Sequence, residues 1–167
     1  HYENKNEIIR EIGENMITEM NELMKLKITN VLNPVKMFTN LFQKLFQIQV
    51  DYAFLFNETV ILINNDLLFK KRSDEARRNW MNFHENLILK LIELKILKHK
   101  NLKEYRTLIQ TQWLILNFWR NHSQLEGIKF DDKRIKEGIL LVFTLAEPYL
   151  TPLGKVTFSK IKKNLET

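Results

Sequence analysis

The chain contains no cysteine, which excludes disulfide bonds, zinc–thiolate sites and cysteine nucleophiles. It has only 4 glycines and 3 prolines, and this shortage of turn-forming residues disfavours a sandwich or barrel of many short strands. Long apolar runs are missing too, since residues 138–143 form one of the longest and a membrane span needs roughly 20 residues. Without a visible signal peptide either, the sequence predicts a cytoplasmic protein with no membrane partner.

The overall composition is that of an ordinary globular domain, with 44% hydrophobic and 28% charged residues. A chain of 167 residues can bury a sizeable core as one domain. The net charge of +6 suggests an affinity for anions such as nucleic acid or acidic lipid. The basic residues are spread along the chain, however, and small clusters such as Lys70-Lys71-Arg72 are typical of solvated helix faces.

Apolar residues recur at helical spacing along the chain. In residues 4–28 the stripe Ile8, Ile12, Met16, Met20 and Met24 repeats every four residues. This repeat predicts a first long helix.

Several signals predict where later helices begin. Asn33-Pro34 combines a capping residue with proline at the first helical position, and predicts a helix over residues 34–51. Ser73 is expected to cap a long helix that ends near Leu97, after a short helix over residues 66–71. Asp131-Asp132 predicts another start.

The remaining segments fit the same architecture. Residues 60–63 favour a strand by propensity, but no partner strand is evident, so residues 57–63 are predicted to form a short buried helix ending near Asn64-Asn65. Further helices are predicted over residues 102–122, 131–147 and 153–165, with Pro148 ending or kinking the second of them. The fold class is therefore predicted to be all-α.

Catalytic and metal-binding patterns are weak. The four histidines form no His-Glu-x-x-His or Glu-x-x-His pairing, and the spacing of His122 and Glu126 is too common to indicate a metal site. No glycine-rich phosphate loop is present. We expect neither an enzyme nor a cofactor or metal.

Three stretches in the same order resemble one family. The segment His1-Tyr2-Glu3-Asn4-Lys5-Asn6-Glu7-Ile8-Ile9 is similar to the end of the TetR helix-turn-helix, with Tyr2 where phenylalanine is commoner. Tyr52-Ala53-Phe54-Leu55-Phe56-Asn57, leading to Trp80 and Phe83, resembles the aromatic cluster of one subgroup. The most specific match is residues 113–119, then 138–145, then Pro148-Tyr149-Leu150-Thr151-Pro152-Leu153-Gly154.

The resemblance to TetR-type bacterial transcriptional repressors implies a function. Such proteins are homodimers that bind operator DNA through N-terminal helix-turn-helix units, and a small molecule in the C-terminal domain changes the spacing of those units. Residues 1–4 would then be a remnant of the helix-turn-helix, and a preceding segment is expected to be missing. Residues 5–167 would be the ligand-binding and dimerisation domain, with the first helix as the lever. The resemblance places Lys5 at a DNA-phosphate contact, although an ordinary exposed lysine is an equal alternative.

In this family two late helices of each subunit form a dimeric four-helix bundle, and the matching segments here are 102–122 and 131–147. Both are apolar on more than one face, which independently favours burial on two sides, by a partner or as a central helix. The predicted dimer-interface residues are Leu114, Ile115, Phe118, Leu141 and Leu145.

A ligand pocket is expected among the aromatic and amide side chains of the middle helices, although such a polar side chain is more often a satisfied core or interface group than a ligand contact. The mixed lining suggests a small, mostly apolar ligand. An alternative function is a helical protein-interaction or dimerisation module without a small-molecule ligand. The predicted ligand-binding residues are Phe42, Phe46, Phe83, His84, Leu87, Gln110, Trp113, Leu116 and Asn117.

Overall fold

The computed structural model describes residues 5–25 and 34–166 and is all-α, as predicted. Within this part of the chain the only extended pairing is an isolated bridge between Leu97 and Leu150. None of the described helices is long and apolar enough to cross a membrane. The helices are α1 (Lys5–Met24), α2 (Pro34–Asp51), α3 (Ala53–Asn65), α4 (Leu67–Glu93), α5 (Leu102–Leu125), α6 (Asp132–Ala146), the 3-10 helix η2 (Glu147–Tyr149) and α7 (Pro152–Glu166).

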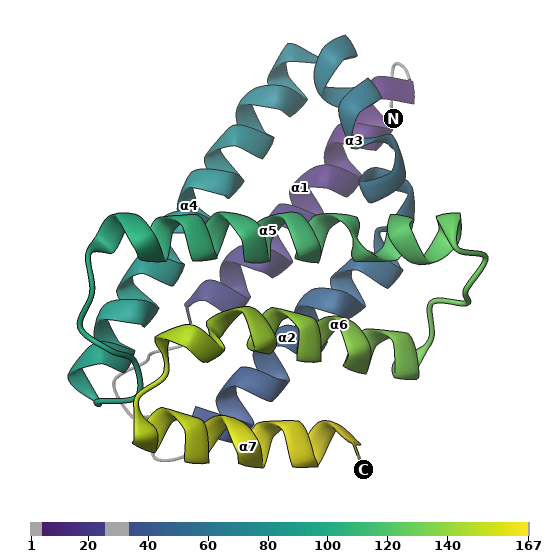
Figure 1. Cartoon of the computed structure of the whole chain (residues 1–167). Helices are drawn as coiled ribbons and strands as arrows, with labels where there is room; N and C mark the ends of the chain where they lie inside the picture. The colour runs from purple at the N-terminus through teal and green to yellow at the C-terminus, as the bar shows by residue number, and fades with distance from the viewer. Residues whose placement is uncertain (1–4, 26–33, 167) are drawn as a thin grey trace.

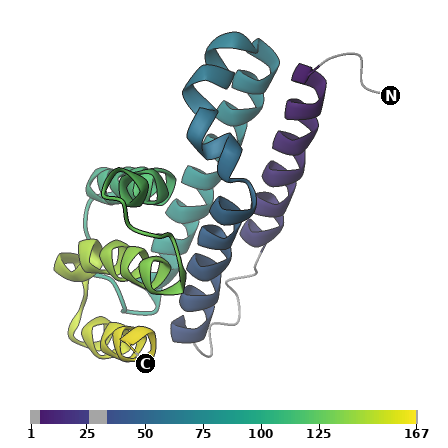
Figure 2. The same cartoon turned by 90° about the vertical axis from the view of Figure 1, so that its right-hand side faces the viewer.

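The helices form two crossed layers. Helices α5, α6 and α7 lie side by side, and Figure 2 shows them end-on as a stack. Helices α1, α2 and α4 run across them, with α3 at one end (Figure 1). The core lies where the layers meet, and its fully buried side chains include Phe46, Trp80, Tyr105, Ile109 and Ile139.

Two of the predicted helix starts are confirmed. Helix α2 begins at Pro34, whereas the predicted cap Asn33 and the helix-turn-helix remnant 1–4 lie outside the described residues. Helix α6 is capped by Asp131, whose carboxylate accepts a hydrogen bond from the backbone N–H of Arg134 at 3.1 Å. Local capping chemistry thus sets the start of α6.

The prediction of a break before Ser73 is wrong, because α4 runs unbroken from Leu67 and Ser73 lies inside it. The cap is Asp66, whose carboxylate accepts hydrogen bonds from the backbone N–H groups of Leu68 and Phe69, both at 3.0 Å. Arg10 of α1 donates to the same carboxylate at 2.6 Å. Burial raises the pKa of Asp66, but the hydrogen bonds from Phe69, Arg10 and Leu68 outweigh it and leave this pKa below its usual value.

The end of α4 and the burial of α3 also differ from the predictions. Helix α4 ends at Glu93 rather than near Leu97, and Lys95 then adopts a left-handed conformation with φ of 58°. Helix α3 is present but not buried as a whole, since Val60 and Ile61 are 67% and 56% exposed. This short helix packs through its other side, and its apolar outer side faces away from the core.

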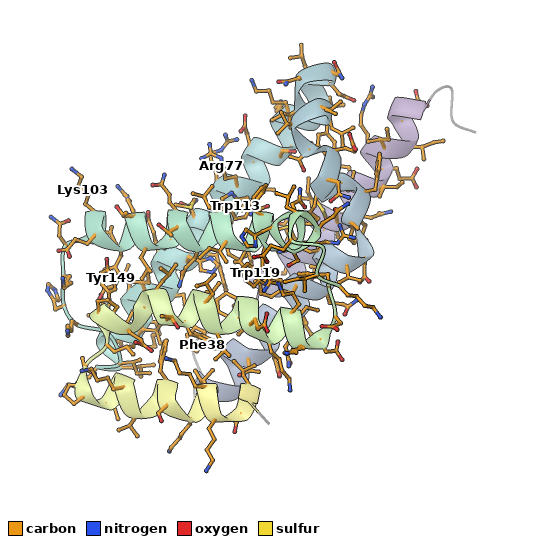
Figure 3. The ribbon with its side chains drawn as sticks, turned by 45° about the vertical axis from the view of Figure 1, so that its right-hand side comes forward. Phe38, Arg77, Lys103, Trp113, Trp119 and Tyr149 are labelled. Atoms are coloured by element: carbon orange, nitrogen blue, oxygen red, sulfur yellow. The ribbon has the colours of Figure 1, made fainter. Side chains whose placement is uncertain are left out.

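A cluster around Arg134 joins α5 to α6. The largely buried Arg134 guanidinium donates to Ser123 Oγ at 2.8 Å and to Glu137 at 2.9 Å, and it also pairs with Glu126. Its carbon Cζ lies 4.0 Å from the centre of the Trp119 ring, whose Nε1 donates to the Arg134 carbonyl at 2.8 Å. Figure 3 shows Trp119 between the two helices. These contacts give α5 and α6 one defined relative position.

Candidate ligand-binding and dimerisation sites

Two small cavities lie inside the bundle, with volumes of about 20 Å³ and about 40 Å³. Each is large enough for about one water molecule and far below the roughly 300 Å³ of an open small-molecule pocket. The smaller cavity is lined by Met20, Leu45, Ile48, Gln49, Phe56, Trp80, Trp113, Leu116 and Asn117. The larger is lined by Phe38, Phe42, His84, Leu87, Ile88, Leu91, Leu97, Leu108, Gln112, Phe143, Ala146 and Phe158.

Aromatic rings connect the two cavities. The Trp80 indole lines the smaller cavity and stacks on His84, a wall of the larger one, with 3.9 Å between ring centres. Trp113 of α5 lies 5.2 Å from Trp80, where α5 crosses α4 (Figure 3). The cavities are therefore neighbours, separated chiefly by the side chains of α4.

Three buried polar atoms in this region have no hydrogen-bond partner among the described residues: Gln49 Oε1, Trp80 Nε1 and His84 Nε2. Each of these side chains is less than 5% exposed. The other polar atoms of Gln49 and His84 are used, since Gln49 Nε2 donates to the Leu116 carbonyl and His84 Nδ1 lies 3.0 Å from the Trp80 carbonyl. Buried polar atoms normally have a partner, so this set marks a region where one is missing.

The protonation state of His84 follows from its surroundings. Burial lowers the pKa of His84 to about 4, although its hydrogen bond to the Trp80 carbonyl acts in the opposite direction. The ring is therefore uncharged at neutral pH. Because a carbonyl only accepts, Nδ1 carries the proton, and Nε2 is left as a free acceptor.

This lowered pKa predicts a loss of stability in acid. Between the ordinary histidine pKa of 6.5 and about 4, the unfolded chain binds a proton at position 84 that the folded chain does not. The contribution of neutral His84 to the free energy of unfolding is therefore complete above about pH 6.5. It declines as the pH falls toward 4, by roughly 3 kcal/mol in total. Urea unfolding at pH 7.5, 6, 5 and 4 measures the decline.

The control for this pH dependence is His84→Gln, which removes the titrating group. Its free energy of unfolding should change less between pH 7.5 and 4 than that of the parent protein. An equal slope in both proteins would show that other groups cause the acid sensitivity.

The structure distributes the predicted ligand-binding residues over different places. Phe42, His84 and Leu87 line the larger cavity, and Trp113, Leu116 and Asn117 line the smaller one. Phe46 is fully buried and packs near Phe130, Phe83 faces an outer groove between α1 and α4, and Gln110 is exposed. The ligand-binding role of all nine stays a prediction.

Sequence reasoning missed Gln49 and the polar edge of Trp80. Gln49 stands four residues after Leu45 and three after Phe46, so helical spacing places it on the apolar stripe of α2. An amide in that register is a signal that could have been found.

An outer groove of about 590 Å³ runs between α3, α5 and α6. Its apolar residues Leu114, Phe118 and Leu141 are 65%, 53% and 37% exposed and line one groove together, unlike apolar residues that are exposed singly. The groove contains four of the five predicted interface residues, Leu114, Ile115, Phe118 and Leu141, whereas Leu145 is partly buried against the core. Their part in dimerisation stays a prediction.

Helix α1 is attached to the first half of α4. Arg10 pairs with Asp66 at 2.6 Å, Arg72 pairs with Glu14 at 2.8 Å, and Gly13 lies against the ring of Phe69. The predicted phosphate contact Lys5 is the first residue of α1, and its side chain lies outside the described part.

Residues 5–25 and 34–166 hold no group of three or more histidine and acidic side chains placed to bind a metal ion.

Comparison with known proteins points to one family. The family model TetR, described as a bacterial transcriptional repressor, matches residues 15–158. The fold is similar to the crystal structure of a TetR-family transcriptional regulator from Marinobacter aquaeolei VT8, with a TM-score of 0.87 and 19% sequence identity. That match covers 98% of this chain and 78% of the other. No curated protein matches the chain.

Proposed function

The chain belongs to the TetR family of transcriptional regulators, and from this premise we propose that it is the sensing and dimerisation domain of a ligand-responsive repressor. In this proposal residues 5–167 bind a small, mostly apolar molecule and pair with a second copy. A helix-turn-helix of about 45 residues, counted as three short helices of ordinary length, precedes residue 5 and binds operator DNA in the bacterial cytoplasm. Residues 1–4 are its end, and Lys5 contacts a phosphate.

The observation that carries the sensing role is the set of three unpartnered polar atoms inside an otherwise apolar core, on Gln49, Trp80 and His84. An unpaired buried polar group costs roughly 1–3 kcal/mol. A bound molecule that supplied the missing partners would offset this cost. Such an arrangement is what a ligand site needs: apolar walls and a few polar groups that orient the ligand.

The contacts of α1 suggest how ligand binding in the core changes the affinity for operator DNA. Met20 of α1 is buried and lines the smaller cavity, on the same helix that Arg10 and Glu14 attach to α4. A ligand that separates the cavity walls pushes on Met20 and changes the angle of α1. The ligand weakens operator binding only if it binds more tightly to the conformation in which the spacing of the two DNA-binding units does not fit the operator.

A second copy is proposed to cover the apolar groove between α3, α5 and α6. Leu114 and Phe118 are exposed together in this groove, and a contiguous apolar patch of this kind is typical of a surface that another protein buries. A two-fold axis through α5 and α6 would place these side chains against their own copies.

The tightness of the core favours the alternative function. Cavities of about 20 Å³ and 40 Å³ leave no room for a ligand without movement of their walls. Cavities this small are expected in a helical module that only pairs with another protein, with one water molecule in each cavity.

Native mass spectrometry followed by thermal-shift assays separates the two functions. Protein purified from a bacterial lysate should carry a small molecule, and adding that molecule to stripped protein should raise the melting temperature by mass action. Leu114→Ala, in the outer groove, should retain the molecule, because the proposed site is internal. Loss of the molecule in this variant would place it in the outer groove, and a protein that carries nothing would favour the module without a ligand.

A further inference from the structure

We infer that the two internal cavities around Trp80 and His84, together called the inner site, take an uncharged aromatic molecule with a hydroxyl group, that is, a phenol. This inference rests on the proposed sensing function and names the chemical class of its ligand. It comes from the kind of hydrogen bond that each unpartnered atom can make, from the charge of the lining and from the rings that surround it.

The unpartnered atoms are one donor and two acceptors. The indole Nε1 of Trp80 can only donate, whereas His84 Nε2 and Gln49 Oε1 can only accept in the states that the structure gives them. A hydroxyl group both donates and accepts, so it can accept from Trp80 and donate to His84 or Gln49. A ketone or ether could only accept and would leave both acceptors without a partner.

The lining carries no charge to match an ionised ligand. Neither cavity is lined by an aspartate, glutamate, lysine or arginine. His84 is neutral, because burial holds its pKa at about 4. A carboxylate or ammonium group would lose its hydration here without gaining a counter-charge, which is costly. The site therefore selects against the ionised form of any ligand.

The walls are aromatic on both sides of α4. Trp80 and Trp113 meet at 53° with ring centres 5.2 Å apart, and Phe42 lies edge-on to Phe143 at 5.3 Å. Flat rings pack well in such offset and edge-to-face arrangements. An aromatic ligand inserted beside Trp80 would continue this packing and place its hydroxyl near the polar atoms.

Binding requires the walls to separate, since each cavity has room for about one water molecule. Trp80 is the side chain that a ligand must displace, because it lines one cavity and stacks on His84 of the other. The indole fluorescence of Trp80 and Trp113 should change on binding, over a background signal from Trp119 in the outer groove.

The test compares three probes of similar size on the intact protein at pH 7.5: phenol, toluene and benzoate. Affinities come from tryptophan fluorescence titration and are checked by thermal shift. We expect phenol to bind about tenfold tighter than toluene, the value of one additional buried hydrogen bond, and benzoate not to bind measurably. The ratio of the phenol and toluene affinities is the readout, because a change in stability alone alters both affinities together.

Two variants remove one acceptor each while keeping apolar volume, Gln49→Met and His84→Phe. The ratio should fall toward one in at least one of them and stay near ten in Leu89→Ala, an exposed site on the same helix as His84. A ratio near one in the parent protein, or a ratio of ten that survives in both variants, overturns the hydroxyl assignment and leaves the sensing function intact. Binding of none of the three probes, in a protein that also carries no molecule from the cell, overturns both.

Discussion

Phe118→Glu is expected to dissociate the proposed homodimer into monomers, raising its dissociation constant by roughly 1000-fold or more. Phe118 is 53% exposed in the outer groove on α5, beside Leu114 and Leu141. If a second copy covers this groove through a two-fold axis, each dimer buries the new carboxylate twice. A buried charge without a partner costs several kcal/mol, and each 1.4 kcal/mol changes the dissociation constant tenfold.

Light scattering at micromolar concentration and sedimentation measure the effect. The melting temperature of the monomer should change little, because Phe118 points away from the core. The matched control is Leu89→Glu, which places the same charge on an equally exposed apolar residue of α4, outside the groove. A parent protein that is already monomeric, or a variant that still dimerises, would contradict this interface.

The proposed dimer surface could be predicted from the sequence because it depends on local periodicity. Leu114 and Phe118 are four residues apart on α5 and lie opposite the stripe that contains Ile109 and Leu116. A helix that is apolar on two faces predicts two buried sides before any tertiary contact is known.

The continuity of α4 through Ser73 could not be predicted in the same way, since Asp66 and Ser73 are both good caps by local chemistry and the sequence predicted a helix start at each. Contacts with α1 lie on this stretch, since Arg10 pairs with the Asp66 carboxylate, 56 positions away in the chain, and Arg72 pairs with Glu14. These tertiary contacts favour one continuous helix where local chemistry alone predicts two. The exposed outer side of α3, at Val60 and Ile61, has the same origin, because burial depends on which helices lie alongside it.

The inner site was predictable only in its composition. Aromatic and amide residues on the middle helices indicated a polar spot in an apolar core, and six of the nine predicted residues line the two cavities. The unpartnered state of Gln49 depends on the Leu116 carbonyl, 67 residues away, which occupies its amide nitrogen and leaves its oxygen free. Such pairing follows from side-chain fit between helices and leaves no pattern along the chain.

Gly154→Ala is expected to have the largest effect on stability, lowering the free energy of unfolding by about 3 kcal/mol or more. A Cβ atom at this position in α7 would lie 2.1 Å from the backbone oxygen of Ile96, in the segment after α4. Real Cβ atoms do not approach other heavy atoms within 3.0 Å, so backbone must shift. The motif Pro148-Tyr149-Leu150-Thr151-Pro152-Leu153-Gly154 thus ends on glycine because the first turn of α7 lies directly on this carbonyl.

The Ile96 carbonyl cannot simply retreat, because it accepts a hydrogen bond from the Thr151 backbone N–H at 3.0 Å and another from the Thr151 hydroxyl at 3.2 Å. Moving it away breaks both bonds, and moving α7 instead disturbs the packing of Phe158 and Ile161 in the core. Urea unfolding measures the loss, with the exposed neighbour Lys155→Ala as the control that should stay within about 0.5 kcal/mol of the parent. If Gly154→Ala unfolds at the same urea concentration as Lys155→Ala, the first turn of α7 does not rest on the Ile96 carbonyl. If it loses stability as expected, this contact fixes the first turn of α7 against the segment that follows α4.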